Sequence, residues 1–255
     1  MSLRRALFLL SWIVLTAIAC HVPRDEPVEQ TGEAATAWAE KSLAAVTQLP
    51  IRCDYTTVNK FRRGDVPTVI ELEGGGTFAE GPRSRTELLG ESYPAADAEL
   101  KIGIKIISVT DGSHNWWETT SPLDQPAVVI KSVATPEDGY PGVLGLVAGL
   151  VRDYEFTINS ESEERVELKG VSKVPPYLAI VTLDTATGYP IEIRLGVDPE
   201  SVHMQFESWE RPVTVDEALF FYEIPEGATV QEVAAPVEPA AEEEDPTDNQ
   251  PQEND

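Results

Sequence analysis

The chain has 255 residues, 42% of them apolar, so it is long enough for one or two domains with a sizeable core. Its formal net charge is −25, from 44 acidic and 19 basic residues, which argues against nucleic acid because phosphates would be repelled. No Lys or Arg follows Arg211, whereas 13 Asp and Glu do, so the acidic surplus belongs partly to the C-terminal tail.

Residues 1–19 have the composition of a secretory signal peptide. Two arginines precede the apolar run ALFLLSWIVLTAIA, which is too short and too early for a stable membrane span. The following AIAC leaves two interpretations open: an Ala17-x-Ala19 site for signal peptidase I, or a degraded lipobox in which Cys20 is lipidated. Two or three acyl chains on Cys20 would suffice for stable anchoring. We therefore expect an exported, periplasmic protein that lipidation would anchor to the outer membrane.

Two segments of low apolar periodicity flank the part of the chain that should fold. Residues 20–30 contain two prolines and several charges, as expected of a tether. Residues 234–255 are rich in Pro, Glu and Ala and lack aromatics, so they should be disordered. This leaves residues 31–233 as one folded domain between the tether and an acidic tail.

Residues 31–49 carry the signals of an amphipathic helix. Thr31 is the expected N-cap and Pro50 ends the segment. Apolar residues recur at three- and four-residue spacing: Ala35, Trp38, Ala39, Leu43, Val46 and Leu49. The apolar face of this helix needs a partner surface.

Alternating sequences on either side of mid-chain predict strands. The first set runs from IRCDYTTVNKF to AVVIKSV, and the second from YEFTINSES to LFFYEIP. Their connections are short and include the Asp111-Gly112 turn, so both sets should be antiparallel meanders. Cys53 in the first strand is expected to be buried and inert, because no neighbour would stabilise its thiolate.

Between the two sets, the segment YPGVLGLVAGLVRDYEF predicts a short helix that is apolar nearly all round. About ten residues cannot span a bilayer, so packing must hold this helix. The element order therefore predicts a mainly β (α+β) fold: a strongly curved antiparallel half-barrel sheet of about 11 strands with helices covering its concave face. Such a shell can leave an apolar space between helix and sheet.

The stretch DGSHNWWETTSP contains two adjacent tryptophans, which a strand with one buried face does not explain. Neighbouring residues on a strand point to opposite faces, so Trp116 and Trp117 cannot both enter one core. In one interpretation Trp117 faces the concave cavity and Trp116 packs on the convex side. In the other, both are structural aromatics with a partly exposed edge.

Motifs for catalysis, cofactors and metals are missing from the sequence. The three histidines have no metal-ligand spacing, and there is no nucleophile elbow, phosphate loop or dinucleotide fingerprint. Paired acidic residues are better explained as solvated faces than as acid/base pairs. The sequence therefore favours a protein that is not an enzyme and that uses no cofactor or metal.

The ordered set of motifs resembles the LolA/LolB superfamily of periplasmic lipoprotein carriers and receptors. The opening helix and meander, GPRSR after GGGTF, DGSHNWWETTSP, PGVLGLVAGLVRDYEF, DTATGYPIEIRL and FFYEIPEGATV carry the resemblance over most of residues 31–233. It implies a half-barrel with a helical lid and an apolar interior for acyl chains. It also implies an arginine that helps to hold the lid closed, for which Arg85 or Arg83 is the nearest match. A lipidated Cys20 would depart from the soluble carrier and favour a receptor-like or locally acting role.

Two functions follow as hypotheses. The first is binding of a lipid or lipoprotein acyl chain in the half-barrel cavity. Its expected ligand-binding residues are Trp38, Leu43, Arg85, Trp117, Leu144, Val147 and Leu150. The second is an envelope-stress sensor or interaction module that binds an envelope protein partner, and a filled interior with an exposed aromatic patch would favour it.

Overall fold

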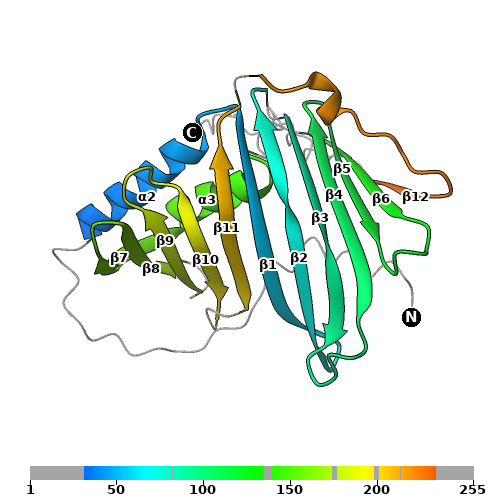
Figure 1. Cartoon of the computed structure of the whole chain (residues 1–255), viewed down its shortest axis with the longest axis horizontal. Helices are drawn as coiled ribbons and strands as arrows, with labels where there is room; N and C mark the ends of the chain where they lie inside the picture. Colours follow the sequence, from blue (N-terminus) through cyan, green and yellow to red (C-terminus); the bar gives the residue numbers. More distant parts are fainter. Residues whose placement is uncertain are drawn as a thin grey trace, which may run out of the picture.

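The computed structural model describes residues 32–81, 83–134, 139–173, 177–197, 201–212 and 214–233. It shows one open, curved sheet of 12 strands with two helices against it (Figure 1), which confirms the predicted fold class. The predicted signal peptide, tether with Cys20, and acidic tail lie outside the described residues. Neither described helix has the length and apolar composition needed to cross a bilayer.

The chain builds the sheet as two antiparallel meanders. The first contains β1 (Ile51–Arg63), β2 (Val66–Ala79), β3 (Arg83–Pro94), β4 (Ile102–Asp111), β5 (His114–Thr120) and β6 (Val128–Val133). The second contains β7 (Tyr154–Glu161), β8 (Arg165–Ser172), β9 (Leu178–Asp184), β10 (Pro190–Gly196) and β11 (Val202–Glu210). Strands β1 and β11 pair antiparallel and join the two halves, so the order is β12-β6-β5-β4-β3-β2-β1-β11-β10-β9-β8-β7.

The end of the chain departs from the predicted strand LFFYEIP. Its first two residues end the 3-10 helix η2 (Glu217–Phe220), and the last strand, β12 (Thr229–Val233), begins after the predicted segment. Pro225 lacks the N–H that a ladder requires, which disfavours a central strand at this position. Strand β12 pairs parallel with β6, whereas the other described strand pairs are antiparallel.

The helices α2 (Gly32–Val46) and α3 (Gly142–Asp153) lie over one face of the half that contains β7–β11 (Figure 1). We call this the inner face of the sheet and the opposite one the outer face. The residues that α2 buries include Ala35, Ala39 and Val46, whose small size lets the helix lie close to its partners. The core between helices and sheet includes Phe78, Leu144, Val147, Leu150, Phe156, Leu168, Leu183, Ile193 and Phe206.

A second, smaller cluster lies on the inner face of the other half. It contains the buried residues Ile70, Leu72, Ile104 and Ile106, with Phe61 and Leu88 packed against them. Pairing of Leu88 with Ile106 places these side chains on one face across neighbouring strands. The inner face is therefore apolar well beyond the part over which the helices lie.

Arg211 ties the C-terminal end of α2 to the sheet. Its guanidinium donates hydrogen bonds to the backbone oxygen of Ala45, at 3.3 Å, and to the side chain of Gln48. It also donates to the hydroxyl of Tyr189, at 2.8 Å. A cation near the last carbonyls of a helix is favourable because it faces the negative end of the helix dipole.

We expect Arg211→Ala to lower the free energy of unfolding by about 1 kcal/mol, because these bonds are charge-assisted but partly exposed to water. Urea denaturation followed by far-UV circular dichroism measures the change. Arg52→Ala is the matched control, since Arg52 forms only an exposed ion pair with Asp54. Equal losses in the two variants would show that Arg211 does not hold the helix.

Candidate functional site

The space between the helices and the sheet is filled. The void there has a volume of about 10 Å³ and is lined by Ala39, Ser42, Val147, Leu150, Val151, Phe156, Leu168, Val181, Leu183 and Ile193. Small-molecule sites are typically about 300 Å³ or larger, so this void is too small for an acyl chain. The one polar side chain in this lining, Ser42, is buried, and its hydroxyl has no hydrogen-bond partner among the residues that the structure describes.

Most residues expected to line a cavity are part of this filled core. Leu144 is 0% exposed, and Val147 and Leu150 are also buried against the sheet. Trp38 and Leu43 are partly buried and pack against the same core. The sequence indicates which faces of α2 and α3 are apolar, but the closeness of packing between them and the sheet depends on side-chain volumes across several strands.

A larger pocket lies on the inner face of β4, β5 and β6, next to the start of α3. Its volume is about 300 Å³. The lining comprises Ser108, Thr110, Asn115, Trp116, Trp117, Ile130, Ser132, Ala134, Gly139, Tyr140, Pro141 and Gly142. None of these lining residues is charged, so the pocket presents aromatic, aliphatic, hydroxyl and amide groups to a ligand.

Strand register explains why these residues meet. Trp117 pairs with Ser108 on one side and with Ile130 on the other, so all three share the inner face. Ile106, two residues before Ser108 on the same strand, continues this row into the inner-face apolar cluster. Among the predicted site residues outside the helices, Trp117 is the one that lines the pocket.

The two adjacent tryptophans face opposite sides of the sheet, as β-strand geometry requires. Trp117 lies on the inner face with 39% of its surface exposed, and its indole N–H donates to the hydroxyl of Thr119 at 3.0 Å. Trp116 lies on the outer face and stacks on Tyr222, with ring centroids 5.2 Å apart. The two rings therefore pack on different faces, although Trp116 is also among the residues that border the inner-face pocket.

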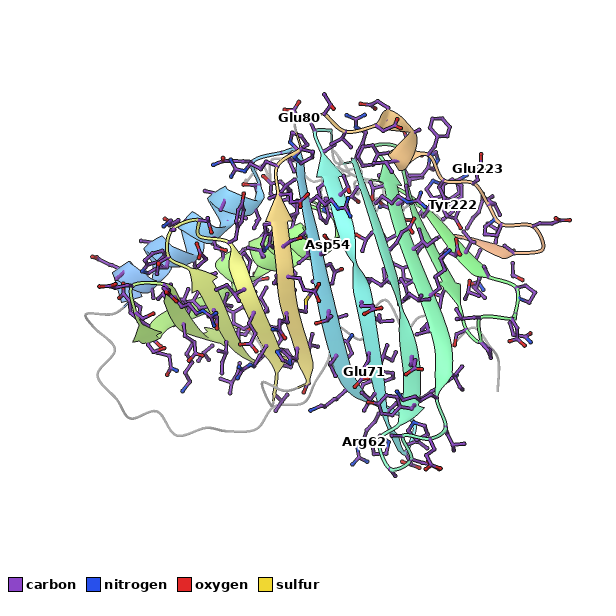
Figure 2. The ribbon with its side chains drawn as sticks, viewed as in Figure 1. Asp54, Arg62, Glu71, Glu80, Tyr222 and Glu223 are labelled. Atoms are coloured by element: carbon purple, nitrogen blue, oxygen red, sulfur yellow. The ribbon has the colours of Figure 1, made fainter. Side chains whose placement is uncertain are left out.

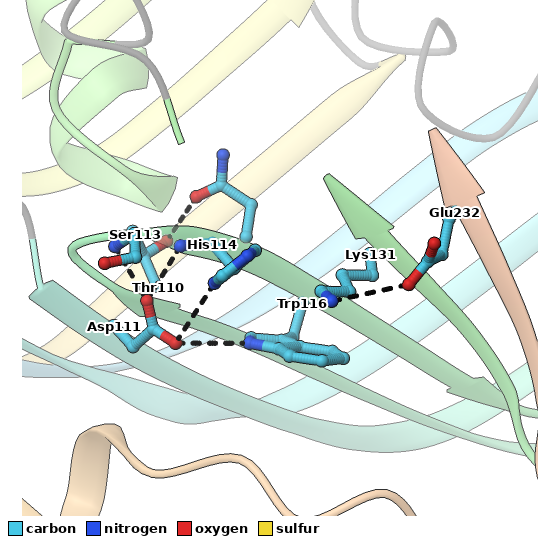
Figure 3. Close-up of polar contacts among 8 residues, drawn as sticks. Thr110, Asp111, Ser113, His114, Trp116, Lys131 and Glu232 are labelled. Atoms are coloured by element: carbon cyan, nitrogen blue, oxygen red, sulfur yellow. Dashed lines mark hydrogen bonds and ion pairs between the residues drawn. The ribbon is translucent and has the colours of Figure 1, made fainter. Parts of the chain in front are cut away.

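Asp111, Lys131 and Tyr222 contact the Trp116 ring on the outer face, and Figure 3 shows the first two. Its indole N–H points at the Asp111 carboxylate, at 3.4 Å. The Lys131 ammonium lies 5.2 Å from the ring centroid and also pairs with Glu232 of β12 at 3.4 Å. Tyr222 stacks on the same ring.

Asp111 stabilises the turn between β4 and β5 through its charge. Partial burial raises the pKa of this carboxyl, but backbone N–H bonds from His114 and Ser113, both 2.7 Å long, and the Trp116 indole lower the pKa and outweigh the burial. The resulting pKa is below the ordinary 3.8. The following Gly112 adopts φ +93°, which favours glycine, so the predicted turn forms as expected.

A carboxyl whose pKa is lowered by folding stabilises the protein above its unfolded pKa and loses this contribution as pH falls through the folded pKa. We expect Asp111→Asn to be less stable than wild type at pH 7 by up to about 1 kcal/mol, since the group is partly exposed. This difference should shrink as pH falls below 3.8. Urea titrations at several pH values measure it, and a difference that is independent of pH would contradict the assignment.

The arginines that resemble the family's lid-holding residue lie on the outer face, away from the helices. Arg83 forms an ion pair with Glu217, and Arg85 pairs with Glu87 and donates to the backbone oxygen of Leu219 at 3.4 Å. Inner-face Thr86, which lies between Arg85 and Glu87 on β3, instead approaches Gly142 of α3. Arg211, in contrast, donates a hydrogen bond to the backbone oxygen of Ala45 in α2.

Sequence reasoning missed Ser108, Asn115, Ile130 and Tyr140 as pocket residues. The Asp111-Gly112 turn fixes the register of β4 against β5, so it could have placed Ser108 and Asn115 beside Trp117. The sequence could not indicate that Tyr140 lines the pocket, because its position depends on where α3 begins relative to the sheet. Cys53 is buried as expected, and burial raises the pKa of its thiol to about 12.

No cluster of three or more His, Cys, Asp or Glu side chains suited to a metal ion occurs within the part of the chain that the structure describes. No protein-family model and no curated protein matches the sequence significantly.

A comparison with solved structures finds neighbours at low sequence identity. An uncharacterized conserved protein from Thermus thermophilus is 11% identical, with a TM-score of 0.46 over 77% of this chain and 98% of its own. MucB is 15% identical, with a TM-score of 0.40 over 75% of this chain and 63% of its own. A LolA superfamily protein from Nitrosomonas europaea is 9% identical, with a TM-score of 0.31 over 74% of this chain and 97% of its own.

Proposed function

We propose that this chain is an exported cell-envelope protein that binds a lipid or lipoprotein acyl chain on the inner face of β4–β6. The observation that carries the proposal is the pocket of about 300 Å³, which contains a partly exposed indole and lies beside a row of buried isoleucines. Burying hydrocarbon contributes about 0.8 kcal/mol per CH₂ group. The affinity for an acyl chain in this position would therefore rise with the length of the chain.

The pocket lining also suits the polar end of such a ligand. Ser108, Thr110, Asn115 and Ser132 supply hydroxyl and amide groups at the pocket, while Trp117 and Ile130 supply apolar surface. Few polar groups among apolar and aromatic ones are typical of sites that orient an amphipathic ligand. In this proposal the acyl chain lies on the inner face outside the filled space beneath α2 and α3.

The domain organisation supports an envelope location as part of the same proposal. Residues 1–19 would direct export, Cys20 would carry the lipid anchor, residues 20–30 would form the tether, and residues 234–255 would form an acidic tail. An anchored protein cannot diffuse freely, so a receptor-like or locally acting role at the outer membrane fits better than a shuttle.

Mass spectrometry tests both parts of this proposal. We expect the full chain, purified from a bacterial envelope in mild detergent, to carry a diacylglycerol mass that Cys20→Ser removes. Solvent extraction of the same protein should release a lipid at about one molecule per chain. Protein with no bound lipid, whether or not Cys20 is modified, would contradict the binding role.

A second candidate function is an envelope sensor or protein-interaction module. It is favoured by the filled space beneath the helices, with its void of about 10 Å³, and by exposed aromatic side chains such as Phe221, which is 79% exposed. A lipid-free protein that instead retains an envelope protein through this surface would support it.

A further inference from the structure

The last described segment of the chain crosses the outer face of β3–β6, and we call residues 214–233 the C-terminal strap. Near its start, Glu217 forms an ion pair with Arg83 of β3. The Phe220 ring, 3% exposed, lies beneath the same guanidinium at 5.3 Å. This first anchor combines a charge with a buried aromatic ring.

Tyr222 provides a second anchor on β5. Its ring stacks on Trp116, and its hydroxyl donates to the Glu118 carboxylate at 2.9 Å. Figure 2 shows Tyr222 on the strap, where it passes over the strands of the first meander. Glu118 is 4% exposed, so Tyr222 supplies a hydrogen bond that this buried carboxylate needs.

Beyond these anchors the strap buries little of its surface. Strand β12 adds five residues in parallel to the edge of β6, and its side chains are exposed or half-exposed. Phe220 is the one fully buried side chain among the described residues of the strap. Segments with few buried contacts open at a lower free energy than the core.

Strand register places buried side chains on the outer face of β4–β6, where Tyr222 stacks on Trp116: Ile107, Val109, Val129 and Glu118. Exposing apolar side chains and a buried carboxylate of this kind to water is unfavourable for the apolar groups and removes the hydrogen bond from Tyr222 to Glu118. Displacing the strap would also uncover the edge of β6, whose N–H and C=O groups β12 now pairs. Unpaired strand edges beside apolar surface are templates for addition of another strand.

We propose that this outer surface of β3–β6 is a second binding site, for an extended segment of a protein partner, and that the strap occupies it when no partner is bound. The chemistry of the strap defines the partner segment: an acidic residue, then aromatic residues three and five positions later, as in Glu217, Phe220 and Tyr222, followed by a β-strand. This proposal is independent of lipid binding on the inner face.

A partner segment must compete with the strap for the outer surface of β3–β6. A tethered segment acts at an effective concentration of about millimolar, so a free segment of equal affinity does not displace it readily. Partner binding therefore requires either tighter anchors than those of the strap or prior loosening of the strap.

Hydrogen exchange on the full-length protein tests whether the strap opens by itself. We expect the backbone amides of residues 214–233 to exchange faster than those of β4 and β5, because the strap buries little. Protection of the strap equal to that of β4 would overturn the proposal, since the strap would then be an integral part of the sheet.

Fluorescence anisotropy tests the site with a dye-labelled synthetic peptide that covers residues 214–233. The full-length Tyr222→Ala variant, which loses the stack and the bond to Glu118, should bind this peptide about tenfold or more tighter than wild type. Phe221→Ala, at an exposed neighbour, should bind like wild type. A peptide lacking both aromatic anchors should bind to none of these proteins.

Glu217→Ala provides a milder variant if Tyr222→Ala fails to fold, because it removes only the ion pair with Arg83. The proposal is overturned if the peptide binds neither variant although exchange shows that their straps have opened. It is also overturned if opened variants self-associate without taking up the peptide, because the surface would then serve as an interface between two copies.

Discussion

Replacing Leu144 by alanine is expected to lower the free energy of unfolding by roughly 2–5 kcal/mol. Leu144 lies in α3 and is 0% exposed, packed into the core between the helices and the sheet. The void beside this core is only about 10 Å³, so the removed methyl groups leave a cavity that the surroundings fill poorly. Urea denaturation of both proteins, followed by circular dichroism, measures the loss.

The control is Leu146→Ala, two residues later on the same helix, where the side chain is only partly buried and the loss should be smaller. The comparison separates a structural helix from a movable lid. If Leu144→Ala costs less than about 1 kcal/mol and increases fatty-acid binding, α3 opens over a hidden cavity and the filled core described here is wrong.

Ile130→Glu is expected to reduce affinity for a fatty acid by about 100-fold or more, because it places a carboxylate where the ligand would exclude water. Ile130 pairs with Trp117 across β5 and β6 and lines the pocket. Its side chain is only half-buried without ligand, so the charge stays hydrated in the free protein and the fold should survive. Isothermal titration with a soluble medium-chain fatty acid measures the change.

Val133→Glu is the matched control for this substitution. Val133 ends the same strand, is half exposed and pairs with His114, so the new charge does not face the pocket. It should leave fatty-acid affinity within about twofold of wild type. Equal losses of fatty-acid affinity in both variants would show that the added charge acts through the net charge or the folding of the protein and not through the pocket.

Local sequence patterns were sufficient for most of the architecture. Spacing of Ala35, Ala39 and Val46 predicted α2, and alternation within HNWWETT predicted that the two tryptophans face opposite sides. The glycine turn after Asp111 then fixed which residues of β4 lie beside them. These features depend on backbone preferences within a few residues, which a single sequence records well.

Features that depend on distant contacts were not predictable from the same patterns. The sequence indicates that Leu144 and Val147 are apolar, but whether they line a cavity or a filled core depends on how side chains from several strands meet them. Arg85 has the motif position of a lid-holding residue, yet strand alternation puts it on the outer face. The aromatic residues of LFFYEIP predict a strand there, whereas its first two residues end η2 and the strand β12 lies further along the chain.

Tryptophan quenching by a brominated fatty acid tests the central claim most directly, because bromine quenches only nearby indoles. On titration of the full-length protein, we expect saturable quenching in wild type and in Trp116→Phe, whose mutated ring lies on the outer face. Quenching should fall sharply in Trp117→Phe, which lacks the indole at the inner-face pocket. Absence of saturable quenching in wild type, or equal quenching in the two variants, would contradict acyl-chain binding at this pocket.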